Sequence, residues 1–445
     1  MVTKAPPTGK LARTSISGLA LAHAGIVRLG HQARQVTRTE AEKATAQTEY
    51  ETELGRILFR ALNQLRGTAL KLSQLLSMEA GFLPEGVRRE LAKGCYQVTP
   101  LNRALVHKVF RHEFTQTPEQ LFAHFDAHAF AAASLGQVHC AQLADGTQVA
   151  VKIQYPGIAA CIHSDIRMLR GLLQTLSLGA TVMPSEEVIA KVLHEVEHKL
   201  KEELDYQHEA QQLNWFYQQV RLAQIVIPRP ITSHSSMRIL TMQKLEGLHL
   251  DAWLATEPPQ EDRNHYGQLL FDWFWHSVCD LQRLHADPHP GNFLMMAEGQ
   301  LGILDFGCTR SLSKEFCAAM AQAWHALLKL KLGASAEQYA LVHAAYRTLG
   351  LIDPDMSLGE LEEQLIPVVA IFIDWQLEPY VQAHFDFRHK SAHPTPQANE
   401  RKHLVKIGTA FDTDILYFDR AYLGLMHMLK KIGATVNTQN PWTTS

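Results

Sequence analysis

Four polar residues are spaced along the chain as a phosphoryl-transfer site would need them. Lys152 ends the alternating segment "VAVK", Asp287 and Asn292 lie five residues apart in "HADPHPGN" (285–292), and Asp305 begins "DFG". A lysine on a rigid strand can clamp phosphates, and the side-chain oxygens of Asn292 and Asp305 suit Mg²⁺. Asp287 can orient a nucleophile and accept its proton. The set favours kinase-type chemistry with ATP or ADP and Mg²⁺.

The lysine itself needs a carboxylate partner. The helical segment that follows offers Glu203, Asp205 and Glu209. At about 100° per residue, Asp205 and Glu209 share a helix face, whereas Glu203 points roughly 200° away from Asp205. The residues alone leave open which carboxylate holds Lys152.

The helices and strands that position these residues can be predicted from the spacing of apolar residues and from turn residues that end each segment. Residues 40–125 have helical spacing, and 130–155 alternate with an Asp145-Gly146 turn that predicts a β-hairpin. One helical stretch is predicted over 165–176 and a continuous one over 185–216. Further strands are predicted in "QIVIPRPI", "SMRILTMQKLEG" and "GQLGILDFG" (299–307), with helices dominating from 261 onward.

Composition narrows the class of protein. The chain has 445 residues, 46% of them hydrophobic, and 42 Lys and Arg against 45 Asp and Glu give a net charge of −3. This is ordinary globular composition and nothing in it attracts nucleic acid. Six scattered cysteines without a C-x-x-C pair indicate a reducing compartment. No apolar run reaches the roughly 20 residues of a spanning helix.

The N-terminal segment is basic. Residues 1–39 carry six Lys and Arg and no acid around a short apolar stretch. This pattern fits a cleaved signal peptide, an amphipathic helix on an anionic membrane surface, or an ordinary packing helix. The three alternatives stay open at this point.

Two features depart from an ordinary protein kinase. The phosphate-covering G-x-G-x-x-G loop is replaced by "FAAASLGQVH" (130–139), whose alanine Cβ atoms limit close backbone approach. After "DFGCTR" the chain runs directly into a predicted helix with no segment ending in A-P-E. A docking platform for peptide substrates is therefore not expected.

Taken together, the motifs resemble the UbiB/ADCK family of atypical protein-kinase-like proteins over residues 50–435. The matching segments are "KLSQ" (71–74), "AAASLGQVH" (131–139), "VAVK" (149–152), "ELDYQHEA" (203–210), "HADPHPGN" (285–292) and "DFG" (305–307). The resemblance implies a bilobal α+β kinase-like fold, with a small antiparallel sheet lobe, a helical lobe and an N-terminal helical extension. The domains expected are 1–45, a basic amphipathic segment; 46–125, the extension; 126–246, the small lobe; and 247–445, the helical lobe.

The resemblance also implies roles for individual residues. Lys152, Glu209 and Asp287 would form the catalytic set, with Glu209 pairing Lys152, and Asn292 and Asp305 would hold Mg²⁺. The nucleotide would further contact Ala131, Ala132, Ala133, Ser134 and Gln243.

A regulatory set is implied in the same way. Lys71 and Gln74 would lie over the nucleotide pocket, and Lys71 would engage Glu203 or Asp205, which would block access for protein substrates. Ser73 stands where the family has glycine, and a side chain there alters how closely that helix can pack.

The function implied is ATP binding with ATPase or kinase chemistry in support of isoprenoid-quinone biosynthesis. Partners would be quinone-biosynthesis proteins or lipid-like precursors, with no nucleic acid. The location expected is cytoplasmic, peripheral to the inner membrane, without a transmembrane helix.

Three other functions compete with this one. "HEVEH" (194–198) fits the H-E-x-x-H zinc-protease pattern, but the acids downstream belong to the same helical run and cannot fold back as a third ligand. A small-molecule phosphotransferase of aminoglycoside-kinase type shares the loop but not the extension with "KLSQ". A pseudokinase scaffold would bind nucleotide without turnover.

Overall fold

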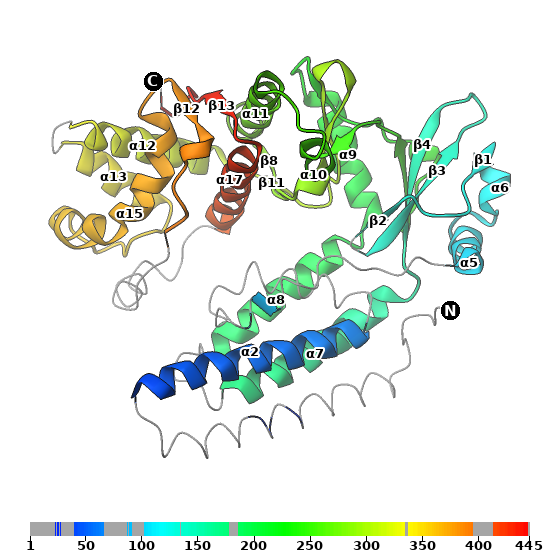
Figure 1. Cartoon of the computed structure of the whole chain (residues 1–445), viewed down its shortest axis with the longest axis horizontal. Helices are drawn as coiled ribbons and strands as arrows, with labels where there is room; N and C mark the ends of the chain where they lie inside the picture. Colours follow the sequence, from blue (N-terminus) through cyan, green and yellow to red (C-terminus); the bar gives the residue numbers. More distant parts are fainter. Residues whose placement is uncertain are drawn as a thin grey trace. The chain divides into compact units, whose positions relative to one another are not determined.

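The computed structural model describes residues 40–65, 102–133, 135–177, 186–333, 337–394 and 413–443, with single positions at 23, 25, 27, 87, 89 and 90 (Figure 1). Two compact units divide the chain: Met1–Gln211 with Pro230–Lys244, here the sheet unit, and Gln212–Arg229 with Leu245–Ser445, here the helical unit. Each is described by itself. Lys71, Ser73, Gln74, Ser134 and residues 1–22 lie outside the described residues.

The sheet unit is built on a five-stranded antiparallel sheet of order β1-β3-β4-β6, with β2 paired to β3 (Figure 1). Its strands are β1 (His124–Phe125), β2 (Ala131–Ala133), β3 (Gly136–Gln142), β4 (Gln148–Gln154) and β6 (Ile239–Gln243). A short turn, η1 (Thr232–His234), precedes β6. Because β4 has a partner strand on both sides, it lies in the interior of the sheet.

The hairpin predicted from Asp145-Gly146 is confirmed. β3 and β4 pair from Gly136↔Gln154 to Gln142↔Gln148. Gly146 has a φ of +87°, which glycine adopts without a steric penalty. The Asp145 side chain accepts a hydrogen bond from the amide of Thr147 at 2.9 Å, which closes the turn.

Two helices pack against this sheet. Asn102 caps α5 (Arg103–Phe114) by accepting a hydrogen bond from the amide of Leu105, and α6 (Pro118–Leu121) follows. Their apolar side chains join those of the sheet in one core: Val106, Val109, Phe110, Phe122, Ala141, Val149, Val151, Ile153, Ile231 and Ile239. The last part of the segment expected as a helical extension therefore packs with the sheet.

Longer helices among the described residues of the sheet unit are α2 (Glu40–Leu65), α7 (Ile158–Ser177) and α8 (Glu186–Glu202). α7 packs against α8, and a polar contact of 3.5 Å joins His163 Nδ1 to Glu197 Oε1. The predicted continuous helix over 185–216 is wrong, since α8 ends at Glu202 and α9 (Tyr206–Gln219) begins after a three-residue break. The division between the two units falls within α9.

The described residues of the helical unit form three small sheets besides its helices. Their orders are β5-β10-β9-β7, β11-β8 and β12-β13. The strands are β5 (Ile225–Val226), β7 (Leu248–His249), β8 (Arg283–His285), β9 (Phe293–Met295), β10 (Leu301–Ile303), β11 (Thr309–Ser311), β12 (His384–Asp386) and β13 (Thr435–Asn437). The sequence predicted strands around β5 and β10 in this region, and the other strands of these sheets were not predicted.

The helices in the described part of this unit are α10 (Leu250–Leu254), α11 (Gln260–Trp275), α12 (Lys314–Lys331), α13 (Glu337–Thr348), α14 (Leu358–Glu360), α15 (Ile366–Leu377) and α17 (Thr413–Ile432). Short 3₁₀ or π turns lie at η2 (His276–Asp280), η3 (Pro290–Asn292), η4 (Ala297–Gly299), η5 (Leu361–Leu365), η6 (Glu378–Tyr380) and η7 (Phe387–His389). α11 and α17 pack together (Figure 1). Aromatic side chains pack between the two helices, and the ring centroids of Phe274 and Phe418 lie 5.6 Å apart.

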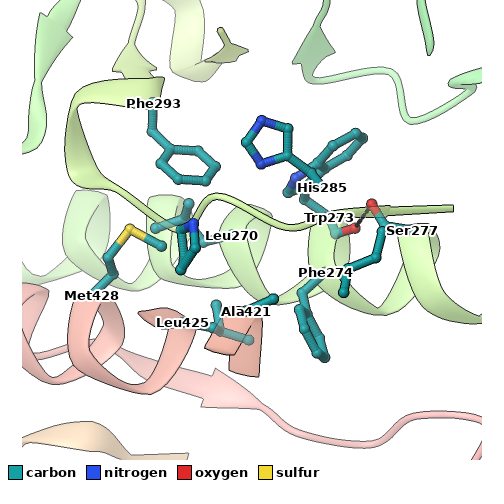
Figure 2. A pocket seen from close by; sticks show the side chains of 11 residues that line it. Leu270, Trp273, Phe274, Ser277, His285, Phe293, Ala421, Leu425 and Met428 are labelled. Carbon is teal, nitrogen blue, oxygen red and sulfur yellow. Dashed lines mark hydrogen bonds between the residues drawn. The ribbon is translucent and has the colours of Figure 1, made fainter. Parts of the chain in front are cut away.

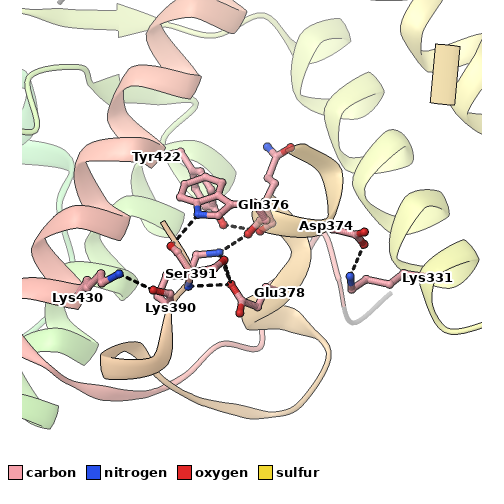
Figure 3. A network of polar contacts seen from close by, with 9 residues as sticks. Lys331, Asp374, Gln376, Glu378, Lys390, Ser391, Tyr422 and Lys430 are labelled. Atoms are coloured by element: carbon pink, nitrogen blue, oxygen red, sulfur yellow. Dashed lines mark hydrogen bonds and ion pairs between the residues drawn. The ribbon is translucent and has the colours of Figure 1, made fainter. Parts of the chain in front are cut away.

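A buried cation joins α15 to the segment after β12 (Figure 3). Lys390 Nζ donates to Glu378 Oε2 at 2.9 Å and to the carbonyl of Trp375, whose ring centroid lies 4.2 Å away. Ser391 Oγ donates to the same Glu378 oxygen, and Lys430 of α17 donates to the carbonyl of Lys390 at 2.6 Å. The network therefore ties α17 to the loop that precedes it in the chain.

Among the described residues no helix is long and apolar enough to cross a membrane.

Candidate active site

Lys152 is held at the centre of the sheet unit. It lies on β4 opposite Val138 of β3 and Leu240 of β6. Its Nζ donates to both carboxylate oxygens of Glu209, at 2.8 Å each, and the two residues are only 7% and 3% exposed. The ring of Tyr206 lies 5.0 Å from the same ammonium. The expected pairing of Lys152 with Glu209 is present, and it holds the ammonium in one direction.

The break before α9 decides which carboxylate reaches Lys152. The Asp205 side chain accepts from the amide of His208 at 2.9 Å, and its carbonyl accepts from the amide of Glu209 at 3.0 Å. Asp205 thus begins a new helix, because a short carboxylate that binds free N-terminal amides competes with helix continuation. Glu203 and Asp205 were expected on one helix with Glu209. They lie in the connection instead, and Glu209 alone sits on the helix.

The alanine-rich segment is a strand rather than a loop. Ala131, Ala132 and Ala133 form β2 and pair with β3, the last of them opposite Gly136. A Cβ at Gly136 would come within 2.3 Å of the Ile153 carbonyl oxygen, so only glycine fits at this position. Gln243 is exposed at the end of β6, opposite Val149.

In the helical unit, two pairs of short strands bring the other candidates together. β8 pairs with β11, and β9 pairs with β10. Backbone hydrogen bonds then link the loops between them: Ala286 N to Cys308 O at 2.9 Å and Leu304 N to Asn292 O at 2.8 Å. The segments of Asp287, Asn292 and Asp305 therefore lie side by side, although the three residues are spread over 19 positions of the chain.

Side-chain hydrogen bonds fix this arrangement. Asn292 Nδ2 donates to Asp287 Oδ2 at 2.9 Å and to the Asp287 carbonyl at 3.1 Å. His285 Nε2 bonds the Asp305 carbonyl at 2.8 Å, and His289 Nδ1 accepts from the amide of Gly291 at 3.0 Å. Both histidines bond to backbone atoms of the loops. Asp305 has a φ of +56°, a strained value for a non-glycine residue.

The donor chemistry fits Mg²⁺. Asn292 turns its amide nitrogen to Asp287, so its amide oxygen is the atom with which it would coordinate a cation. Asp305 supplies carboxylate oxygens from the adjacent loop, one of which accepts from the amide of Gly307 at 3.2 Å. An amide oxygen and a carboxylate are hard ligands of the kind Mg²⁺ prefers.

Comparison with protein families decides the classification. Residues 90–338, more than half of the chain, match the model of the ABC1 atypical kinase-like domain. The chain belongs to the ABC1 atypical kinase-like family. This confirms the UbiB/ADCK resemblance and the kinase-like α+β fold.

Individual members of the ABC1 family show how far the likeness extends. The atypical kinase coq-8, mitochondrial, of Caenorhabditis elegans is 33% identical over 57% of this chain and 34% of its own length. The atypical kinase COQ8, mitochondrial, of Saccharomyces cerevisiae is 30% identical over 57% of this chain and 50% of its own. The chain thus spans between about a third and a half of these two relatives.

This chain is also similar to a solved structure. A Mycobacterium tuberculosis protein, determined in complex with erythromycin, superposes with a TM-score of 0.58 at 23% identity. The match covers 91% of this chain and 96% of that one. The two proteins share their fold.

One residue of the site was not predicted. Arg420 of α17 places Nη2 3.0 Å from Asp287 Oδ1, 133 positions away in the chain. No motif marks it, because its place depends on how α17 packs. Ala421, Leu425 and Met428 of the same helix line an apolar pocket behind the loop, together with His285, Pro288, Phe293 and side chains of α11 (Figure 2).

The zinc-protease pattern does not assemble into a site. His194 and His198 are exposed on α8, and His198 Nδ1 lies 3.5 Å from Glu202 Oε1 one turn later. Within the described ranges, no three His, Cys, Asp or Glu side chains lie close enough together to hold a metal ion. The pattern is a polar helix face.

Proposed function

We propose that this ABC1-family protein binds Mg·ATP and catalyses phosphoryl transfer from it, as an ATPase or atypical kinase. The observation that carries the proposal is the gathering of Asp287, Asn292 and Asp305 on linked loops, with Asn292 bonded to Asp287 and the Asp305 backbone held by His285. The fixed Lys152–Glu209 pair of the sheet unit supports it.

The roles proposed follow the chemistry of each group. Lys152 would neutralise α- and β-phosphate oxygens, and Glu209 is a positioning residue that aims it. Asn292 and Asp305 would hold Mg²⁺, which when bound neutralises charge on the phosphates. Asp287 would orient the attacking hydroxyl or water and take its proton. Ala131–Ala133, Ser134 and Gln243 are proposed to contact the nucleotide.

We further propose that this activity supports isoprenoid-quinone biosynthesis at a membrane surface. Support comes from the shared kinase-like domain with the worm and yeast COQ8 proteins. Quinone-biosynthesis proteins or lipid-like precursors would be the partners. Lys71 and Gln74, together with Glu203 and Asp205, are proposed to regulate access to the site.

The substitution D305N tests the proposal on the purified protein. We expect the wild type to release phosphate from ATP only with Mg²⁺, and D305N to lower this rate roughly 100-fold or more, since the metal contributes several kcal/mol. D355N, at an exposed aspartate of the same unit, is the matched control and should keep the wild-type rate. Phosphate release and titration with a fluorescent ATP analogue are the measurements.

The same variants separate the alternatives. In cells lacking the gene, wild type and D355N should restore quinone content and D305N should not. Nucleotide binding without turnover in the wild type would favour a pseudokinase scaffold. Mg²⁺-dependent turnover in a strain whose quinone content is unaffected by the deletion would favour a small-molecule phosphotransferase.

A further inference from the structure

α17 lies so close to the loop that carries Asp287 that one position of the helix, Gly424, has no room for a side chain. A Cβ added at Gly424 would lie 2.1 Å from Pro288 Cβ and 2.3 Å from its Cγ. Real Cβ atoms do not approach other atoms this closely, and the proline ring cannot rotate away. The glycine therefore sets how near the helix comes to the loop.

One helical turn earlier, the same face presents Arg420. Residues four apart on a helix lie above one another, so the close approach at Gly424 also brings Arg420 to the loop. Its Nη2 donates to Asp287 Oδ1 at 3.0 Å, and the two side chains are 14% and 13% exposed. Asn292 donates to the other carboxylate oxygen. The two oxygens of Asp287 thus have different donors, which fixes the plane of the carboxylate.

The beginning of α17 is tied to the segment after Asp305. Arg310 Nε donates to Asp414 Oδ1 at 2.5 Å, and Arg310 Nη2 donates to Thr413 Oγ1 at 3.2 Å. α17 also contacts β8, the strand that leads into the loop (Figure 1). One helix, more than 100 residues later in the chain, therefore braces both segments that hold the candidate residues.

We propose that Arg420 is a positioning residue that orients Asp287 for phosphoryl transfer, with Gly424 setting the distance over which it acts. The inference rests on the proposed function. The guanidinium beside Asp287 comes from α17. A planar guanidinium restrains a carboxylate in direction as well as in charge, which an ammonium does not. Arg420 acts on the reaction through Asp287.

Steady-state kinetics of Mg²⁺-dependent ATP hydrolysis test this in R420Q, R420K and G424A. We expect R420Q and G424A to lower kcat roughly 10- to 100-fold, because small misplacements of a catalytic group cost this much, with KM for ATP changed by less than about twofold. R420K should recover part of kcat. R347Q at an exposed arginine and G359A at a helical glycine with open space around it are the matched controls and should behave as wild type.

A second comparison separates positioning from general support of the fold. If Arg420 acts through Asp287, R420Q should lower the residual rate of D287N no further. R420K retains the cation and is the variant to analyse if R420Q does not fold. Equal kcat in folded R420K, G424A and wild type, or additive losses in the double variant, would overturn the inference while leaving the proposed function intact. A wild type that hydrolyses no ATP would overturn both.

Discussion

Lys152 and Glu209 form a buried ion pair, and such a pair is not explained by stability. Removing two charges from water costs about as much free energy as their attraction returns, so apolar residues of similar size often do equally well. Both side chains are nearly fully buried, and the ammonium meets both carboxylate oxygens. The pair is better explained by the proposed task of Lys152, which needs a cation pointing in a fixed direction.

Substituting one member of the pair should therefore destabilise the protein, whereas replacing both with apolar residues should not. E209Q leaves Lys152 buried without its counter-charge and should lower the free energy of unfolding by about 3 kcal/mol. K152M/E209L should recover most of that free energy but hydrolyse no ATP. Urea unfolding and phosphate release measure the two effects.

The control for this prediction is another ion pair of the sheet unit. Arg56 and Glu53 contact at 3.1 Å but are 50% and 32% exposed, so E53Q should cost less than about 1 kcal/mol. A double variant as unstable as E209Q would show that the ion pair itself stabilises the fold.

At the scale of elements, what could be predicted was local. Alternating apolar and polar residues and a turn dipeptide predict the hairpin around Gly146, and the helical spacing of apolar residues predicts α12. The break at Glu203–Asp205 was missed because helical periodicity runs through it without a glycine or proline. There the capping bonds of Asp205 prevail over helix continuation.

Elements with distant partners could not be predicted. β12 pairs with β13 from His384↔Asn437 to Asp386↔Thr435, and each has three residues. Segments this short carry no periodic signal, and their pairing depends on the packing of the helices between them. Arg420 was missed for the same reason. Motifs identified the residues of the proposed site that lie in short contiguous segments, and not the helix that braces them.

Gly136 offers a test of how closely β3 must approach its neighbours. In G136A the new Cβ would lie 2.3 Å from the carbonyl oxygen of Ile153, a backbone atom of the strand that carries Lys152. Overpacking of this kind costs typically 1–3 kcal/mol. We expect a lower Tm and weaker binding of a fluorescent ATP analogue.

G171A is the matched control for G136A. Gly171 lies in α7 of the same unit, and a Cβ there meets no atom within 4 Å. Since alanine favours helix over glycine by up to about 1 kcal/mol, G171A should equal or exceed the wild type in Tm. A G136A protein as stable as G171A would mean that β3 and β4 can separate without cost.

At the scale of the whole molecule, carboxylates with lowered pKa values lie in both units. In the sheet unit, burial would raise the pKa of Glu119, but hydrogen bonds from backbone and from Arg103 bring it to about 2. In the helical unit, burial likewise opposes the shift at Glu378, and hydrogen bonds from Lys390 and Ser391 lower its pKa. Both units therefore lose stability as these groups are protonated in acid.

The more buried of the two carboxylates gives the sharper prediction. Because the folded-state pKa of Glu378 lies below the 4.5 of an unperturbed glutamate, its ionised form stabilises the protein above that pH. This contribution is lost as the pH falls through the folded-state value. E378Q should therefore have a lower Tm than wild type near neutral pH, and the two curves should converge as the pH falls below 4.5 and through the folded-state pKa of Glu378.

Thermal unfolding followed by circular dichroism between about pH 3 and pH 8 measures this convergence. E362Q, at an exposed glutamate of the same unit, is the control and should melt with the wild type. Burial lowers the pKa of Lys390, and the hydrogen bond and charge of Glu378 oppose this shift. A Tm difference between E378Q and wild type that stays constant from neutral to acid pH would mean that Glu378 stabilises the network by packing and not as the counter-charge of Lys390.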